Sequence, residues 1–167
     1  MAGKGRYHHG DLRQALLQTG LDMLEQVGLE GLSLRKIAAG VGVSHAAPEH
    51  HFATLKHLLN AMATEGFRVF AATMRKDMRE SDGSDAEQLR AAARGYLAFA
   101  TAHPNLFRLM FNSNLIDWSD PLLGQAGQDA LGILSAICLP AARRLNLDTP
   151  AGRASVEQLV WSQIHGY

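Results

Sequence analysis

Side chains able to do recognition or metal chemistry gather in residues 1–60. Six of the eight histidines lie there, and imidazole both binds transition metals and donates hydrogen bonds. His50, His51 and His57 are close in sequence, but adjacent histidines on a helix point in different directions. No cysteine or carboxylate completes a spacing typical of zinc. We therefore expect a solvated face beside a polyanion, with no bound metal and no cofactor.

The element that must position these side chains is residues 33–52, SLRKIAAGVGVSHAAPEHHF. Ser33 is a good N-cap for a short helix, and Ser44 can cap a second one. Gly40 and Gly42 allow the chain to reverse between them. This pattern predicts a helix-turn-helix, whose second helix can enter the major groove of DNA. Pro48 lacks the N–H that the second helix needs, so that helix is expected to start tightly or to be short.

The second helix would place Ser44, His45 and Ala46 nearest the base edges, where histidine can donate to guanine and alanine can contact a thymine methyl. Some of these residues could instead only cap and pack. Lys4 and Arg6 lie on a glycine-rich stretch that is either a DNA-contacting arm or an ordinary disordered terminus. The full set of expected DNA-facing residues is Lys4, Arg6, Ser33, Arg35, Ser44, His45, Ala46, Glu49, His50, His51 and Lys56.

Composition sets broad limits on the class of protein. The 167 residues contain 16 basic and 16 acidic side chains, so the whole chain has no net attraction for nucleic acid, and only its N-terminal region is mildly basic. The single cysteine excludes an internal disulfide. No apolar run approaches the length of a membrane span, and no signal peptide is visible. These features predict a soluble, cytoplasmic protein with no membrane partner.

Helical periodicity and cap residues continue throughout the chain, and no alternating strand pattern is present. The sequence therefore predicts an all-α fold, with a helix-turn-helix domain at 1–53 and a helical domain at 54–167. Pro140 is expected to kink or divide its helix. The inward faces of the helices are expected to include Val27, Leu131 and Leu159. The last apolar pattern is still running at Tyr167, which suggests a truncated chain that has lost a packing partner.

The C-terminal half is rich in aromatic side chains and methionines. Ligand sites are mostly apolar with a few polar groups, so these residues could line an effector site, although plain core packing explains each of them as well. His165 could orient a ligand or simply bond a carbonyl. The candidates are Phe70, Met74, Tyr96, Phe107, Met110, Phe111, Trp118, Trp161 and His165. For an enzyme, the sequence offers no nucleophile and base at a useful spacing, no phosphate loop and no paired carboxylates.

Residues 9–70 resemble the N-terminal domain of the tetracycline-repressor (TetR) family. The resemblance rests on the connector at 28–32, on Ser33 to Ala38, on Gly42-Val43-Ser44 and on His51-Phe52. The segments 102–111 and Trp161 with His165-Gly166 resemble the TetR subgroup with a WHG-type C-terminal domain. The resemblance implies a homodimeric transcriptional regulator, usually a repressor, that binds a palindromic operator and responds to a small-molecule effector.

Two residues depart from the family pattern. Glu49 stands where the family usually has a tyrosine that contacts the DNA backbone, and His50 stands where arginine is frequent. Phosphate repels a glutamate, so operator binding is expected to be weak and pH-dependent. Family members also usually continue beyond the His-Gly pair, which makes dimerisation less secure. The alternative is a helical ligand-binding or interaction protein that has weakened or lost DNA binding.

Overall fold

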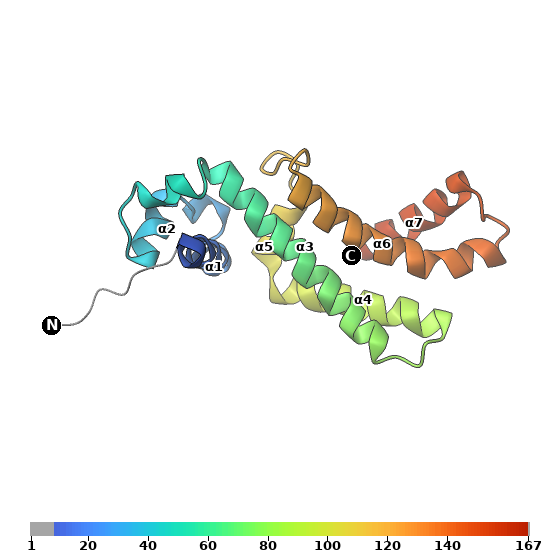
Figure 1. Ribbon diagram of the computed structural model, residues 1–167. Coiled ribbons are helices and arrows are strands. Elements are labelled where there is room, and N and C mark those ends of the chain that lie inside the picture. Colours follow the sequence, from blue (N-terminus) through green and yellow to red (C-terminus); the bar gives the residue numbers. More distant parts are fainter. Residues whose placement is uncertain (1–8, 167) are drawn as a thin grey trace. The chain divides into compact units, whose positions relative to one another are not determined.

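The computed structural model describes residues 9–166, with side chains from Leu12 onward. Within these residues all regular structure is helical, which confirms the predicted all-α fold (Figure 1). Lys4 and Arg6, the two expected contacts of the N-terminal segment, lie outside the described residues. The elements are α1 (His9–Val27), the 3₁₀ helix η1 (Leu29–Gly31), α2 (Leu34–Val41), the 3₁₀ helix η2 (Ala47–His50), α3 (Leu55–Arg79), α4 (Asp85–Ala102), α5 (Pro104–Met110), α6 (Pro121–Arg144) and α7 (Pro150–His165).

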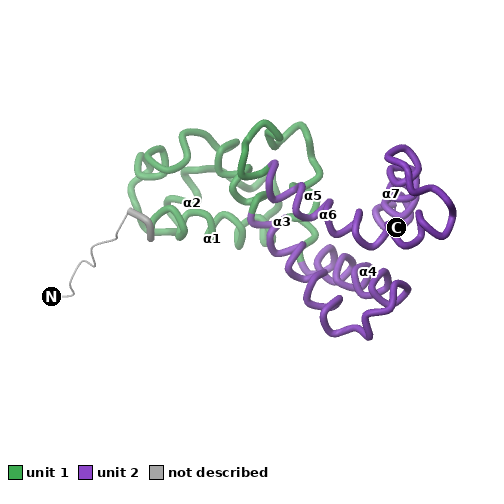
Figure 2. Tube along the Cα trace, turned by 45° about the vertical axis from the view of Figure 1, so that its right-hand side comes forward, with its two compact units in different colours: residues 1–64, 103–123 green, residues 65–102, 124–167 purple. Residues whose placement is uncertain are grey.

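Packing divides the chain into two compact units (Figure 2). The first comprises Met1–Thr64 with His103–Leu123, and the second comprises Glu65–Ala102 with Gly124–Tyr167. Two segments that the sequence places after residue 53, the start of α3 and all of α5, therefore pack with the N-terminal helices. The functional boundary between 53 and 54 stays a prediction.

Side-chain caps begin four of the helices, and the cap predicted at Ser33 is confirmed. The Ser33 hydroxyl accepts from Lys36 N at 3.2 Å, and the Thr54 hydroxyl accepts from His57 N at 3.3 Å. Asp120 Oδ1 accepts from Leu122 N at 2.9 Å, and Thr149 accepts from Gly152 N at 3.1 Å. Each bond satisfies an N–H that the first turn of a helix leaves without a partner.

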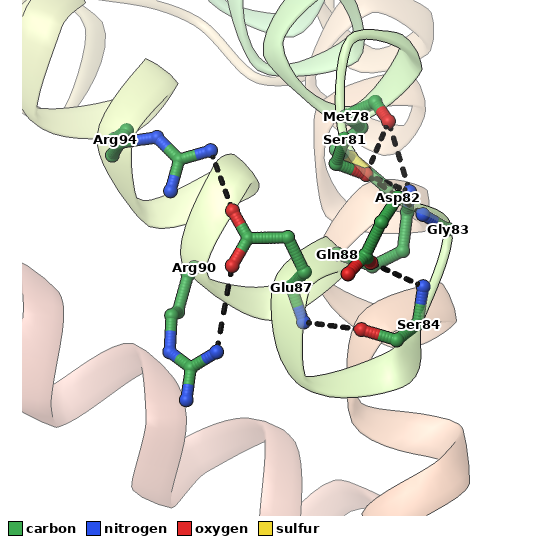
Figure 3. A network of polar contacts seen from close by, with 9 residues as sticks. All are labelled: Met78, Ser81, Asp82, Gly83, Ser84, Glu87, Gln88, Arg90 and Arg94. Atoms are coloured by element: carbon green, nitrogen blue, oxygen red, sulfur yellow. Dashed lines mark hydrogen bonds and ion pairs between the residues drawn. The ribbon is translucent and has the colours of Figure 1, made fainter.

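Residues 80–84 form the turn between α3 and α4, within the second unit (Figure 3). Gln88 Nε2, on the first turns of α4, donates to the Met78 carbonyl at 2.9 Å and to Ser81 Oγ at 2.6 Å. Ser84 N donates to Asp82 Oδ1 at 2.8 Å. Hydrogen bonds from Ser84 hold the pKa of the Asp82 carboxyl below its ordinary value. The turn is therefore fixed by its own polar groups.

The structure tests the expectations about Pro140 and about three apolar side chains, on α1, α6 and α7. Of the two outcomes expected at Pro140, a kink or a division, division does not occur: α6 runs unbroken from Pro121 to Arg144. Three apolar side chains that were expected to face the core are exposed: Val27 at 54%, Leu131 at 53% and Leu159 at 61%. The apolar stripe of these helices is wider than the face that this chain covers. Periodicity shows which residues share a face but not what lies against it.

The small core between α6 and α7 is built from Cys138, Ala142 and Val156, with Leu134, Ile137 and Val160 packed against it. Among the described residues α6 alone is long and apolar enough, by length and composition, to cross a membrane. The expectation that no segment approaches the length and hydrophobicity of a membrane span is therefore wrong for α6. One such helix is weak support for a membrane span, because core helices of soluble proteins meet the same condition.

Candidate nucleic-acid interface

Helix α2 is held tightly against α1. Ile37 and Ala38 are fully buried, and a Cβ built on Gly40 would lie 2.9 Å from the Thr19 side chain on α1. Gly40 is therefore a packing residue inside α2, whereas the reversal occurs at Gly42, which has a φ of 79°. That left-handed conformation is easy for glycine and strained for most other residues.

The segment after this turn is the largest departure from the predicted helix-turn-helix. In place of a second α-helix, the structure has a turn and the four-residue 3₁₀ helix η2. Ala46 occupies the N-cap without a side-chain bond, so the expected capping by Ser44 is wrong. The carbonyl of Ser44 accepts from Ala47 N at 3.1 Å. An α-helix would require that bond from residue 48, and proline has no N–H to donate.

Two buried side chains anchor this short segment. Pro48 and Phe52 are almost completely buried, and the Pro48 carbonyl accepts from Phe52 N at 2.8 Å. The guanidinium carbon of Arg13, on α1, lies 5.0 Å from the centre of the Phe52 ring, within the range of a cation–π interaction. The turn therefore has a fixed inner side, although it is not a regular helix.

The outer side of the turn carries most of the residues that the sequence assigned to DNA. Ser44, His45, Ala46, Glu49 and His50 are all exposed, and His51 is half-buried. Exposed polar side chains on a rigidly anchored segment are what contact with base edges and phosphates requires. Glu49 places a negative charge in this group, which opposes approach to phosphate.

The remaining expected contacts flank the turn. Ser33 is occupied as the cap of α2, and Arg35 is exposed on the first turn of that helix. Lys56 is exposed at the start of α3, but its ammonium lies 3.9 Å from Asp117 Oδ2. An exposed pair at that distance contributes little energy, so Lys56 can exchange Asp117 for another anion.

The candidate effector residues fall into two groups. Phe107, Met110, Phe111 and Trp118 lie in the first unit, where the Phe107 and Phe111 rings are 4.9 Å apart and Trp118 is 44% exposed. The others, Phe70, Met74, Tyr96, Trp161 and His165, lie in the second unit.

In the second unit, Tyr96 is the centre of an aromatic cluster. Its ring meets Phe70 edge-on at 5.1 Å and Trp161 edge-on at 6.2 Å between ring centroids. Trp161 and His165 are stacked, with centroids 4.4 Å apart. The Tyr96 hydroxyl and His165 Nδ1 share a hydrogen bond of 2.6 Å. The sequence missed one member, Phe99, whose ring lies 5.3 Å from Phe70; its position three residues after Tyr96 was the available signal.

The two members of the polar pair differ in burial: Tyr96 is buried, whereas His165 is exposed on one side. Loss of water around the hydroxyl raises the pKa of Tyr96 well above its ordinary value, and partial loss of water around the imidazole lowers the pKa of His165. A neutral imidazole and a neutral phenol together offer both a donor and an acceptor in apolar surroundings. Such an arrangement suits an uncharged aromatic ligand better than an ionised one.

The side chains of residues 12–166 form no candidate metal site. No group of three or more His, Cys, Asp and Glu side chains there could hold an ion. The histidines near the turn therefore remain a surface feature of the described chain.

Comparison with known proteins decides the fold family. Residues 89–167 match the family model described as "Tetracyclin repressor-like, C-terminal domain". A segment of 51 residues is 41% identical to the tetracycline repressor protein class C of Escherichia coli; the match covers 30% of this chain and 23% of that protein. The TetR family regulator PfmR of Thermus thermophilus superposes with a TM-score of 0.66 at 19% identity, over 92% of this chain and 82% of that one. The chain has the fold of the TetR-family regulators.

A fuller match has no function attached to it. A protein of unknown function from Rhodococcus sp. RHA1 is 31% identical, with a TM-score of 0.81, over 98% of this chain and 84% of that one. Among these relatives, those with a stated role are described as regulators or repressors. The chain spans only about a quarter of the curated repressor that it matches.

Proposed function

We propose that this chain is a one-component transcriptional regulator, acting as a repressor, that binds palindromic operator DNA as a homodimer. The observation that carries the proposal is the exposed turn from Ser44 to His50, anchored from behind by Pro48 and Phe52. Ser44, His45 and Ala46 would read bases, while the neighbouring polar residues would contact phosphate. The relative named as a repressor supports the direction of regulation.

The exposed leucines support the homodimer. Leu131 on α6 and Leu159 on α7 are more than half exposed, although helical periodicity groups them with the core. A second copy of this chain that packs α6 and α7 against their equivalents would bury both side chains. Apolar faces left open in a single chain frequently mark such an interface.

The aromatic cluster around Tyr96 is the proposed effector site. An uncharged aromatic ligand would stack with Trp161 or Tyr96 and would compete for the Tyr96–His165 hydrogen bond. Trp161, His165 and Gly166 are also the residues that support a WHG-type C-terminal domain. The location that fits this function is the cytoplasm.

A second candidate function is a helical ligand-binding or interaction protein in which DNA binding has weakened or been lost. Two observations favour it. Glu49 is exposed on the turn from Ser44 to His50, which we call the reading turn, and η2 is only four residues long. A short 3₁₀ turn reaches less deeply into a groove than a full recognition helix.

The two candidates separate in a selection of bound duplexes from random DNA, carried out at two salt concentrations and two pH values. The regulator should enrich a palindromic motif whose binding weakens steeply with salt. Failure to enrich any motif at low salt would contradict the regulator and favour the second candidate.

A further inference from the structure

Two helices of the first unit are joined end to end by a carboxylate. Glu25 lies near the C-terminal end of α1. Its Oε1 accepts from Leu106 N at 2.9 Å, and its Oε2 accepts from Asn105 N at 3.3 Å. These are the first N–H groups of α5, which have no partner within their own helix. A negative charge at this position also interacts favourably with the helix dipole.

The same two helices are joined in the opposite direction by an amide. Asn105 Nδ2 donates to the Leu24 carbonyl at 3.1 Å and, more weakly, to the Glu25 carbonyl at 3.4 Å. Both carbonyls belong to the last turn of α1. We call this set of four hydrogen bonds the α1–α5 clasp: each helix end satisfies backbone groups of the other.

The clasp adds directional hydrogen bonds to the apolar contact between α1 and α5. Leu24, Leu106 and Leu109 are buried in the core of this unit. Apolar packing holds surfaces together but permits small rotations and slides, because it is not directional. Hydrogen bonds of 2.9 to 3.4 Å that involve both helix ends select one arrangement.

The position of the clasp in the chain connects it with the reading turn. Helix α1 carries α2 and Phe52 through the close contacts at Gly40 and Arg13. In the chain, helix α5 follows α4, which belongs to the second unit, and precedes α6, which belongs to that unit from Gly124 onward. The contact between α1 and α5 therefore takes part in setting the orientation of the reading turn relative to α5, together with the start of α3, whose Asn60 Oδ1 accepts from Asp117 N at 2.9 Å.

We infer that Glu25 and Asn105 are positioning residues for operator binding: the clasp sets the orientation of the reading turn on α5. In a homodimer this orientation decides whether both reading turns reach two half-sites at once. The inference rests on the proposed function, because it assumes a palindromic operator. Neither residue contacts DNA in this scheme.

The expected consequence differs between a full operator and a half-site. Without the clasp, the side chains from Ser44 to His50 are unchanged, so the reading turn of one protomer should bind a single half-site as before. Only a fraction of dimers would then hold both reading turns at the spacing of the operator. The apparent affinity for the palindrome falls by that fraction. If about one dimer in ten remains competent, affinity for the palindrome falls roughly tenfold.

The test compares Glu25→Ala, Glu25→Gln and Asn105→Ala in the full chain. Each variant is titrated with two duplexes: the palindrome selected by the wild-type protein and a duplex that contains one half-site. Thr149→Ala is the matched control, because it removes a comparable N-cap from α7. Circular dichroism and thermal melting establish that each variant is folded at the assay temperature.

Glu25→Ala and Asn105→Ala should weaken binding to the palindrome about tenfold and leave half-site binding unchanged. Glu25→Gln should be intermediate, since its amide oxygen keeps one acceptor. Thr149→Ala should lower thermal stability without changing either affinity. If Glu25→Ala does not fold, Asn105→Ala carries the test, because it leaves the Glu25 carboxylate in place.

Three outcomes would overturn the inference: wild-type affinity of the folded clasp variants for the palindrome, equal losses on both duplexes, or the same loss in Thr149→Ala. Equal losses would mean that the reading turn itself is damaged. Failure of the proposed function looks different, because the wild-type protein would then select no palindrome before any residue is changed.

Discussion

The hydroxyl of Tyr96 and Nδ1 of His165 lie 2.6 Å apart and join α4 to α7 through one short hydrogen bond. The two residues are 69 positions apart in the sequence. Tyr96 is buried against Phe70, and Trp161 stacks on His165 from within α7. This bond is therefore the polar centre of the aromatic cluster in the second unit.

Tyr96→Phe should lower the free energy of unfolding by about 1 kcal/mol, because a net intramolecular hydrogen bond contributes roughly that amount. The phenyl ring keeps the packing against Phe70, so the fold should persist. Urea unfolding followed by circular dichroism measures the change. Stability equal to that of the wild type would show that solvent replaces the bond without loss.

Stability should depend on pH through His165. Burial lowers its pKa below the ordinary value of 6.5, so just below pH 6.5 the unfolded chain binds more protons than the folded one. Stability from this residue is complete above pH 6.5 and is lost as the pH falls toward the lowered pKa. Urea unfolding between pH 5 and 8 should therefore show a smaller acid-induced loss in His165→Gln than in the wild type. Parallel pH curves for the two proteins would contradict this role.

The crossing of α3 and α4 should tolerate no side chain at Gly95. A Cβ there would lie 2.7 Å from Met74 Cα, so the backbone of one helix must shift. Gly95→Ala should destabilise the protein by about 1–3 kcal/mol. Gly132→Ala, in α6, is the matched control, because nothing lies within 4 Å of its Cβ position. The control should stabilise by about 0.5–1 kcal/mol through helix propensity; similar values for both variants would refute the close crossing.

Cys138 should be unreactive in the folded protein. Burial, with a further contribution from Glu157, raises the pKa of its thiol to about 11. Roughly one thiol in a thousand would then be ionised at pH 8, and the thiolate is the reactive form. Iodoacetamide should label the native chain far more slowly than the chain in urea. Equal labelling rates would show that the core between α6 and α7 opens freely.

Glu49 should weaken operator binding. Replacing it with tyrosine removes a charge that phosphate repels, and we expect affinity to rise roughly fivefold at low salt. A DNA titration of Glu49→Tyr measures this change. Glu80→Gln, in the α3–α4 loop, changes the net charge equally and should have almost no effect. Unchanged affinity in Glu49→Tyr would show that Glu49 does not lie close to the DNA backbone in the complex.

The sequence by itself determined features that depend on neighbouring residues. Ser33 is predicted as a helix start because a cap bonds an N–H two or three residues ahead. The all-α fold followed from periodicity along each helix. Pro48 also marked the place where the second helix of the motif is interrupted, since the missing N–H is a property of that residue alone.

Only the tertiary structure decided which apolar side chains are covered and which helix ends meet. Leu131 and Leu159 belong to apolar stripes, but their exposure depends on what covers those stripes, and no local pattern records that. The α1–α5 clasp joins residues about 80 positions apart. Glu25 and Asn105 read as ordinary polar residues until folding brings two helix ends together. Local hydrogen bonds join residues a few positions apart and can therefore be predicted from the sequence. Contacts across the fold depend on how every intervening helix packs.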